Sequence, residues 1–320
     1  MDEVADRSIL AIDLGGTQIR AAHVSPDLTV SCRRALETRD EEGVEAVIDR
    51  ICAAARSVRE DAQRAGLADP VGIGISSPGP LDPWNGIVIA PPNLAGWRNI
   101  PLAARVEGAV GLPTYLERDT NAAVMGEWRY GAAKGADDVI YVTVSTGIGG
   151  GLVLDGRPLI GKDGTAGEIG HITVDIDGPL CGDGQPGHAE AIGSGRAIAR
   201  EGRALLARGE APGLAALAAD GGDAECQRVL DRAWVAIGAM CAGLVNGLNP
   251  EVIVLGGSIG CNRPELPSAI RAEIDRRAFP APAQRVRLEM TQFAGDVSLI
   301  GMLPIVNERM ADPSYVKEHA

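Results

Sequence analysis

The stretch Ser8–Thr17, SILAIDLGGT, is an apolar run that ends at a double glycine. A stretch of the same kind, DDVIYVTVSTGIGGG, covers residues 137–151. Apolar runs bounded by glycine predict buried strands, each of which ends in a tight turn. The first run is followed by the strand-like segments QIRAAHVS and LTVSCRRAL, and the second by GLVLDGRPLI, a predicted hairpin around Asp155-Gly156. The pattern at 8–30 therefore recurs at 137–160, which predicts two related α/β halves with a cleft between them.

The segments between and after these two runs carry alternating helix and strand signals. Apolar residues at helical spacing predict a helix from 43 to about 65, and the run 71–76 predicts another strand. The stretch 81–102 is rich in Pro, Asn, Gly and Trp, which predicts a long loop of the kind that often carries function. Further strands are predicted at 112–119 and 251–258, and further helices from near Asn121 and over 224–248.

A chain of 320 residues is longer than one small core needs, so two domains are expected. Residues 1–120, joined by a C-terminal helix at about 304–320, are predicted to form a small N-terminal α/β domain. Residues 121–303 are predicted to form a larger C-terminal α/β domain that carries the glycine-rich loop 167–190.

The composition narrows the class of protein. The formal net charge of -13 argues against nucleic acid and anionic membranes as partners, since both require clustered Lys and Arg. The N-terminal residues MDEVADRS lack the basic and apolar segments of a secretory signal, and no apolar run reaches the roughly 18 residues of a membrane span. The six cysteines show no paired spacing. These features predict a cytoplasmic protein with reduced thiols.

Each of the two glycine-rich turns suits the binding of phosphate. In the first, Asp13 precedes Gly15 and Gly16, which allow close backbone approach, and Thr17 adds a hydroxyl. The second, Ser145–Gly151, follows the strongest predicted strand. Either turn alone is also compatible with a hairpin that simply needs glycine. Two such turns in one chain favour a phosphate group held from two domains.

Other phosphate and hydrolase motifs are excluded by their context. Gly156–Lys162 almost spells a Walker A loop, but Asp163 replaces the required Ser or Thr and the segment lies in a predicted hairpin. The chain has no G-x-G-x-x-G that opens a helix after a strand and no H-E-x-x-H.

Asp119 lies at the predicted end of a strand, just before the helix that begins near Asn121. A carboxylate in this position can act as a general base toward an alcohol. The alternative is that Asp119-Thr120-Asn121 is only a helix N-cap cluster.

The loop 167–190 gathers residues that can bind zinc. His171, Cys181, Asp183 and His188 are all competent ligands, and four is the number that a closed structural site needs. The alternative is that these residues are solvated polar groups of a glycine-rich loop.

Taken in order, these segments resemble the ROK family of bacterial sugar kinases and repressors. The segments that carry the resemblance are DLGGTQIR, SSPGPLDPWNGIVIAPPNLAGWRNIPL, ERDTNAAVMGEWRYGA, STGIGGGLVLDG, AGEIGH with 181–190, and NPEVIVLGGS. They span residues 8 to about 308. The resemblance implies the two-domain actin-like/hexokinase (ribonuclease H-like) fold.

The resemblance also implies roles for individual residues. Asp119 would be the catalytic base for the primary hydroxyl of the sugar. Other sugar hydroxyls would be contacted by Asn93, Glu168, His171 and Glu190. The residues that would bind Mg²⁺ and ATP are Asp13, Gly15, Gly16, Thr17, Thr146, Gly147 and Gly149, with Gly256 and Gly257 near the nucleoside.

Two departures from the family pattern are visible. Arg118 precedes the catalytic Asp where the family usually has Asn. The family's zinc ligands are one His and three Cys, whereas Asp183 and His188 stand here for two of the Cys at the same spacing. A weaker Zn²⁺ site is expected.

The activity expected from the resemblance is phosphoryl transfer from ATP to the 6-hydroxyl of a hexose, with glucose as the first candidate. Kinases of N-acetylmannosamine, N-acetylglucosamine, fructose and allose remain alternatives, and the step from His171 to Cys181 also occurs in N-acetylmannosamine-kinase-like members. The rival class is a transcriptional repressor, whose DNA-binding region would precede Asp13 and for which the charge is unfavourable. A sugar-binding protein without activity is a third alternative. The family suggests a homodimer or homotetramer.

Overall fold

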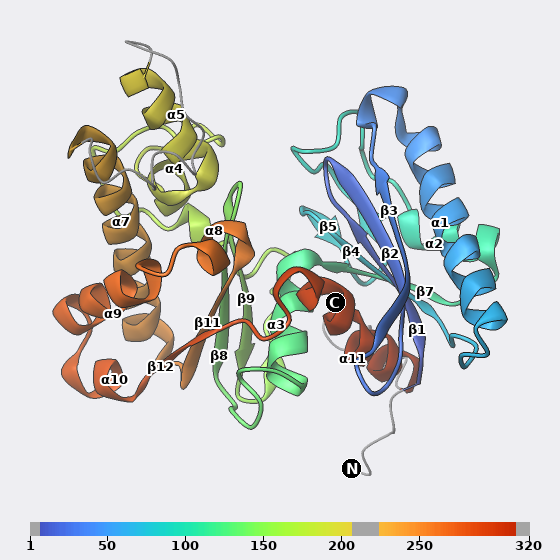
Figure 1. Ribbon diagram of the computed structural model, residues 1–320. Helices are drawn as coiled ribbons and strands as arrows, with labels where there is room; N and C mark the ends of the chain where they lie inside the picture. The colour runs from blue at the N-terminus through green and yellow to red at the C-terminus, as the bar shows by residue number, and fades with distance from the viewer. Residues whose placement is uncertain (1–6, 207–223, 312–320) are drawn as a thin grey trace. The chain divides into compact units, whose positions relative to one another are not determined.

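A computed structural model describes residues 7–206 and 224–311 (Figure 1). The chain groups into two compact units. Unit 1 contains the residues up to Gly135, the segment Pro158–Ala166 and the residues from Gly295 onward, and unit 2 contains Ala136–Arg157 and Gly167–Ala294. This grouping places 121–135 and 158–166 with the N-terminal part of the chain, whereas the predicted division placed them with the rest. The division of the chain into domains 1–120 and 121–303 stays a prediction.

Unit 1 is built on a five-stranded sheet in the order β3-β2-β1-β4-β7. The first three strands form the predicted antiparallel meander, and β4 and β7 add in parallel to β1. The bounds are β1 Ile9–Leu14, β2 Gln18–Val24, β3 Val30–Glu37, β4 Ile73–Ser77 and β7 Thr114–Arg118.

Side chains of β1 alternate between two apolar cores, as the period of a strand requires. Leu10 and Ile12 face the core shared with helices α1 (Val44–Arg64) and α2 (Leu102–Val110). Ile9 and Ala11 face the core shared with α3 (Asp119–Arg129) and α11 (Val297–Ala311). The sheet of unit 1 is therefore covered on both faces, and α11 supplies one cover from the far end of the sequence.

Unit 2 repeats the same strand pattern, with the order β10-β9-β8-β11-β12. The hairpin partner β9 is antiparallel to β8, and β11 and β12 follow in parallel. The bounds are β8 Val139–Val144, β9 Ile148–Leu154, β10 Arg157–Pro158, β11 Val252–Gly256 and β12 Arg287–Met290. The predicted repetition of the two halves is thus confirmed, and so is the turn at Asp155-Gly156, where both residues have positive φ (52° and 67°).

The helices of unit 2 are α4 Ala189–Gly193, α5 Gly195–Leu206, α7 Ala224–Leu248, α8 Gly257–Asn262, α9 Leu266–Arg277 and α10 Pro280–Arg285. Ile140 and Val142 of β8 and Ile253 of β11 share one core with α7 and α9.

Helix α7 is long and apolar enough over Cys226–Leu248 to meet the length and composition of a membrane span. The search of the sequence for uninterrupted apolar runs did not identify this segment. Of its most apolar window 61% is buried inside the structure, as expected of a core helix of a globular protein, so the membrane interpretation is weak.

Two of the predicted loops contain regular structure. The stretch 81–102 contains a small hairpin, β5 (Leu81–Asp82) and β6 (Ile87–Val88), because Leu81 and Val88 are buried and need a paired backbone. Helix α3 begins at Asp119, so the predicted helix start near Asn121 is confirmed. The predicted loop 167–190 is not wholly irregular, since it contains a 3₁₀ turn (Ile169–His171) and the start of α4. Of the predicted helix 304–320, residues 312–320 lie outside the described residues.

Candidate active site

The site residues predicted for unit 1 gather at one edge of its sheet. Strands β1, β4 and β7 are parallel neighbours, with Asp13 of β1 paired to Ser76 of β4 and Ser77 paired to Arg118 of β7. Asp13 and Asp119 therefore both lie at the carboxyl ends of the parallel strands, the edge at which open α/β sheets usually bind ligands.

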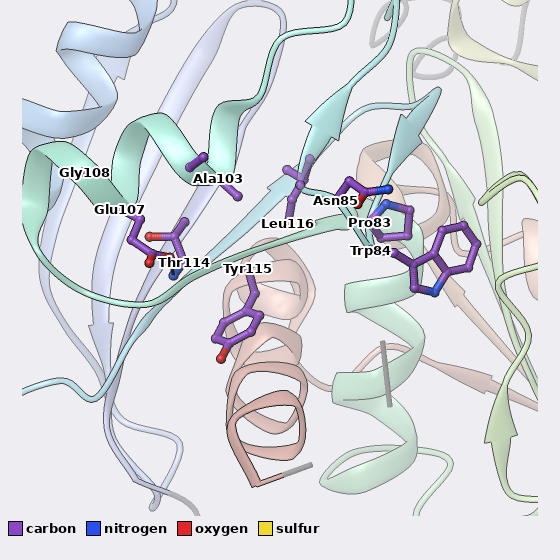
Figure 2. A pocket seen from close by; sticks show the side chains of 11 residues that line it. Pro83, Trp84, Asn85, Ala103, Glu107, Gly108, Thr114, Tyr115 and Leu116 are labelled. Carbon is purple, nitrogen blue, oxygen red and sulfur yellow. Dashed lines mark hydrogen bonds between the residues drawn. The ribbon is translucent and has the colours of Figure 1, made fainter. Parts of the chain in front are cut away.

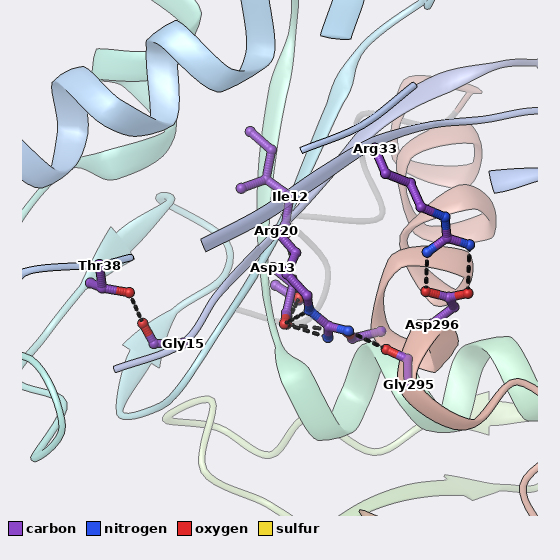
Figure 3. Close-up of polar contacts among 10 residues, drawn as sticks. Ile12, Asp13, Gly15, Arg20, Arg33, Thr38, Gly295 and Asp296 are labelled. Carbon is purple, nitrogen blue, oxygen red and sulfur yellow. Dashed lines mark hydrogen bonds and ion pairs between the residues drawn. The ribbon is translucent and has the colours of Figure 1, made fainter. Parts of the chain in front are cut away.

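The carboxylate of Asp13 is held on both oxygens (Figure 3). Its Oδ2 accepts hydrogen bonds from Nη2 (2.6 Å) and Nε (3.1 Å) of Arg20. Its Oδ1 accepts from the hydroxyls of Ser76 (2.7 Å) and Ser298 (3.1 Å). All the lone pairs of this carboxylate are in use, so Asp13 can bind Mg²⁺ directly only after one of these partners leaves. The donor set fits more readily a carboxylate that acts through metal-bound water.

Arg20 and Arg33 link the meander to the residues that precede α11. Nη1 of Arg20 donates to the carbonyl of Gly295 (2.5 Å), and Arg33 forms a two-pronged ion pair with Asp296 (2.5 and 2.7 Å; Figure 3). The hydrogen bonds from Arg33 hold the pKa of Asp296 below its ordinary value. Neither arginine was assigned a role from the sequence.

The first glycine turn touches the predicted sugar loop. A Cβ on Gly16 would lie 2.7 Å from the carbonyl oxygen of Asn93, which explains why only glycine fits. The hydroxyl of Thr38 donates to the carbonyl of Gly15 (2.6 Å) and fixes the turn. Leu94 and Trp97 are both buried and anchor the loop, while Asn93 stays exposed. The structure therefore brings a predicted phosphate residue and a predicted sugar residue into contact.

Asp119 is the first residue of α3, and the N-cap of that helix is Arg118. The side chain of Arg118 makes no capping hydrogen bond, but Oδ1 of Asp119 accepts one from the N–H of Thr120 (2.8 Å) in the first turn of the helix, so the interpretation as a helix N-terminal cluster stays open. Behind Asp119, the buried carboxylate of Glu117 accepts hydrogen bonds from Arg309 (2.5 Å) and from Nδ2 of Asn121 (2.9 Å). The junction between β7 and α3 is thereby fixed from inside the unit.

In unit 2, the second glycine turn is organised by Glu190. Oε2 of Glu190 accepts a hydrogen bond from the backbone N–H of Ile148 (2.8 Å), and a Cβ on Gly147 would lie 2.5 Å from the same oxygen. The start of α5 holds the other side, where the N–H of Arg196 donates to the carbonyl of Thr146 (3.1 Å). Glu190, predicted to contact sugar, thus also supports a predicted phosphate turn.

The double glycine that ends β11 lies beside this turn. A Cβ on Gly257 would lie 2.4 Å from the carbonyl oxygen of Val144, and the hydroxyls of Ser258 and Ser145 are 2.9 Å apart. A Cβ on Gly256 would lie 2.0 Å from the hydroxyl of Tyr141. The two predicted nucleotide segments of unit 2 are therefore brought together.

The predicted zinc ligands form one cluster. One ligand atom from each of His171, Cys181, Asp183 and His188 lies within 4.8 Å of the others. Nδ1 of His171 is 3.1 Å from Oδ2 of Asp183 and 3.2 Å from Nδ1 of His188. Burial raises the pKa of the Cys181 thiol, whereas the N–H of Gln185 and then the two histidines lower the pKa of Asp183. Two nitrogens, one sulfur and one oxygen at this separation fit the tetrahedral preference of Zn²⁺.

Glu168 begins the 3₁₀ turn that ends at His171, and its Oε2 is 3.9 Å from Nε2 of that histidine. Two of the three residues predicted for sugar binding in the loop 167–190 are thus neighbours, and His171 would also be a metal ligand.

A separate pocket of about 420 Å³ lies in unit 1 between α2, the β5–β6 turn and β7 (Figure 2). Glu107, Thr114 and Tyr115 lie toward one end of it and Trp84 toward the other. Its lining contains none of the residues predicted for sugar or nucleotide binding.

Sequence reasoning missed the partners that hold the site in place. Arg20 and Ser76 lie inside quoted motifs, and the pairing of strand ends could have pointed to Ser76. Ser298 and Arg309 lie far along the chain from the residues they hold, and no local pattern marks them.

The two repeated sheets, each followed by helices, define an α/β protein of the two-domain actin-like/hexokinase fold. The ROK family model matches residues 9–309, and the chain belongs to the ROK family.

Two relatives are similar over nearly their whole length. A glucokinase of Thermotoga maritima is 33% identical, with 94% of this chain and 98% of the relative covered. An N-acetylmannosamine kinase of Citrobacter koseri is 34% identical, with 92% and 97% covered.

Three solved structures are also similar. A ROK hexokinase from Thermus thermophilus has a TM-score of 0.81 at 32% identity, covering 94% of this chain and 99% of that one. A ROK glucokinase from Streptomyces griseus, in complex with glucose and AMPPNP, has a TM-score of 0.79 at 31% identity, with the same coverage. A ROK transcriptional regulator, a homolog of the E. coli MLC protein, has a TM-score of 0.82 at 26% identity, covering 94% of this chain and 78% of that one.

Proposed function

We propose that this chain is an ATP-dependent sugar kinase that transfers the γ-phosphate of ATP to the 6-hydroxyl of a hexose, with glucose as the first candidate. The observation that carries the proposal is the arrangement in unit 1, where Asp13 and Asp119 lie at one sheet edge and the Gly16 turn touches Asn93. The kinases among the similar proteins support the same class of reaction.

Asp119 is proposed as the general base. Phosphoryl transfer depends mainly on positioning and on neutralising charge, so a carboxylate that accepts the proton of the attacking hydroxyl is the side-chain chemistry that the reaction needs. Asn93, Glu168, His171 and Glu190 are proposed to orient the other sugar hydroxyls.

The phosphates of ATP are proposed to meet the two glycine turns. Gly15, Gly16 and Thr17 offer backbone N–H groups and a hydroxyl from unit 1, and Thr146, Gly147 and Gly149 do so from unit 2. Gly256 and Gly257 would leave room for the nucleoside. Mg²⁺ would neutralise phosphate charge, and Asp13 would orient its water ligands.

The base assignment is tested with Asp119→Asn and Asp119→Ala. Both variants are expected to lose at least about 10²-fold in kcat, because a positioned general base contributes that much or more. ADP release in a coupled assay measures the rate, and Asp49→Asn, which changes an exposed aspartate of α1, is the matched control. A folded Asp119→Asn variant with a near-normal rate would rule out the assignment.

N-acetylmannosamine is the second candidate substrate. The N-acetylmannosamine kinase relative is as similar as the glucokinase relative, at 34% against 33% identity. A panel of glucose, N-acetylmannosamine, N-acetylglucosamine, fructose and allose, compared by kcat/KM in the ADP-release assay, distinguishes the candidates. The sugar with the highest kcat/KM identifies the substrate, and a best rate on a sugar other than glucose contradicts the first candidate.

A structural Zn²⁺ is proposed at His171, Cys181, Asp183 and His188. The ion would hold the loop that presents Glu168 and Glu190, and it would take no part in the transfer step. Metal analysis of purified protein is expected to give about one zinc per chain, the stoichiometry of a single closed site, and less in His188→Ala. Far less than one zinc in fully active protein would contradict this proposal.

A transcriptional regulator is the rival of another class, since one regulator shares the fold. The formal net charge of -13 is unfavourable for binding DNA. Specific operator binding in a gel shift, without sugar-dependent ADP release, would favour the regulator. A cytoplasmic location and a homodimer or homotetramer are proposed with the kinase.

A further inference from the structure

Arg118 is a buried charged residue at the sheet edge that carries Asp13 and Asp119. It ends β7 and directly precedes Asp119, and only 4% of it is exposed. A buried guanidinium is costly unless its N–H groups are hydrogen-bonded. Its Nη1 donates to the backbone carbonyl of Ala166 at 2.7 Å, which is 48 residues away in the sequence.

Ala166 closes a loop, residues 160–166, that lies against the predicted sugar loop. The N–H of Ala166 donates to the carbonyl of Ile160 (3.0 Å). A Cβ on Gly164 would lie 2.7 Å from the carbonyl oxygen of Leu81, so the two backbones are in close contact there. The chain continues from Ala166 through Gly167 to Glu168, a residue proposed to bind sugar.

The stem of Arg118 reaches a second part of the sugar loop. A Cβ on Gly79 would lie 3.4 Å from Nε and 3.7 Å from Cδ of Arg118. One side chain therefore lies beside the turn at Gly79 and binds the loop 160–166, while its own backbone leads into Asp119.

We infer that Arg118 is a positioning residue for the sugar: it fixes the Gly79 turn and the loop 160–166 relative to Asp119. The inference rests on the proposed function, in which Asp119 receives the proton of the sugar hydroxyl. Arg118 acts through the backbone segments that its side chain positions, and it does not contact the phosphates. Its loss is therefore expected to weaken sugar binding and to leave ATP binding unchanged.

The test compares three variants. Arg118→Met keeps most of the volume and removes the donors, Arg118→Lys keeps one charged donor on a long stem, and Arg118→Asn is too short to reach Ala166. Loss of a hydrogen bond from a charged group predicts a rise of about tenfold or more in the sugar Kd and KM of Arg118→Met. The KM for ATP is expected to stay within about twofold, and Arg118→Lys is expected to recover part of the sugar affinity.

The sugar Kd is measured by isothermal titration with the best sugar of the panel, and thermal unfolding reports on folding. Arg105→Met, which removes an arginine paired at the surface with Glu45, is the matched control. If Arg118→Met does not fold, the inference is tested with Arg118→Lys, by comparing its sugar Kd and its KM for ATP with those of the wild type.

A sugar Kd within about twofold of the wild type in a folded variant overturns the inference, and so does an equal rise in the KM for ATP. These outcomes differ from a failure of the proposed function. That failure appears as an absence of turnover with every sugar or as an active Asp119→Asn, whereas the sugar Kd of Arg118→Met is read without turnover. Binding of no sugar at all contradicts both.

Discussion

At the scale of single residues, the site depends on charges that are buried and fully partnered. Glu117, two residues before Asp119, forms an ion pair with Arg309, and the two residues are 2% and 4% exposed. Arg309 also donates to the carbonyl of Leu116 (2.9 Å), and the N–H of Arg118 donates to Glu117 (2.9 Å). The carboxylate is thus surrounded by donors, which is the condition under which a buried charge is tolerated.

Arg309→Met tests this ion pair. The substitution leaves the charge of Glu117 buried without its partner, so the free energy of unfolding is expected to fall by about 3–5 kcal/mol. Denaturant unfolding measures the change. Arg64→Met, which breaks an exposed pair with Asp61, is the control and is expected to change stability by less than about 1 kcal/mol. Equal effects of the two substitutions would contradict the argument.

At the scale of elements, α3 and α11 cross with their backbones in contact. A Cβ on Gly301 would lie 1.7 Å from the carbonyl oxygen of Ala122, and one on Gly126 would lie 3.1 Å from the carbonyl oxygen of Val297. Glycine at both positions lets α11 approach the helix that begins with Asp119. The position of the proposed base thus depends on how closely these two helices pack.

Gly301→Ala is expected to force the two helices apart. The added methyl group overlaps backbone that has no other place to go, so a loss of about 1–3 kcal/mol in stability and a reduced kcat are expected. The control is Gly243→Ala in α7, where a Cβ meets nothing within 4 Å. That substitution is expected to be neutral or to stabilise by up to about 1 kcal/mol, since Ala is the better helix former. A neutral Gly301→Ala would show that the crossing is not tight.

Cys241 of α7 is expected to be chemically inert. It is fully buried, and burial raises the pKa of its thiol to about 12 from an ordinary value of 9.0. Since the folded pKa lies above the unfolded one, the contribution of this thiol to stability is fully present below pH 9.0 and is lost as the pH rises toward 12. Alkylation of folded protein at pH 8, followed by mass mapping, is expected to modify the exposed Cys261 and to spare Cys241 until the protein unfolds. Equal modification of both would contradict this.

At the scale of the whole molecule, local signals predicted the repeated strands and the glycine turns, because apolar runs and glycine pairs are written in consecutive residues. The partners of the site residues could not be predicted. Ser298 is 285 residues from Asp13, and Arg309 is 192 residues from Glu117. Such contacts arise only when α11 closes over the first sheet. The roles of individual residues toward sugar and ATP stay predictions.

A fragment that ends at Gln292 tests the contribution of α11 to unit 1. Without this helix, the core shared by Ile9, Ala11, Met302 and Val306 loses one side. The fragment is expected to lose the cooperative thermal unfolding of the full chain and to bind the dye ANS, which reports exposed apolar surface. A cooperative transition at the temperature of the full chain would contradict the expectation.

The hydrogen bond between Ser298 and Asp13 joins residues far apart in the sequence, which affects how unit 1 folds during synthesis. Asp13 is translated 285 residues before its partner Ser298, and the helix that covers the first sheet follows with that partner. At about 5–20 residues per second, the apolar face of β1 waits on the order of tens of seconds for its cover. Unit 1 is therefore completed only once α11 has been synthesised, and until then the apolar face of β1 formed by Ile9 and Ala11 is open to binding by a chaperone.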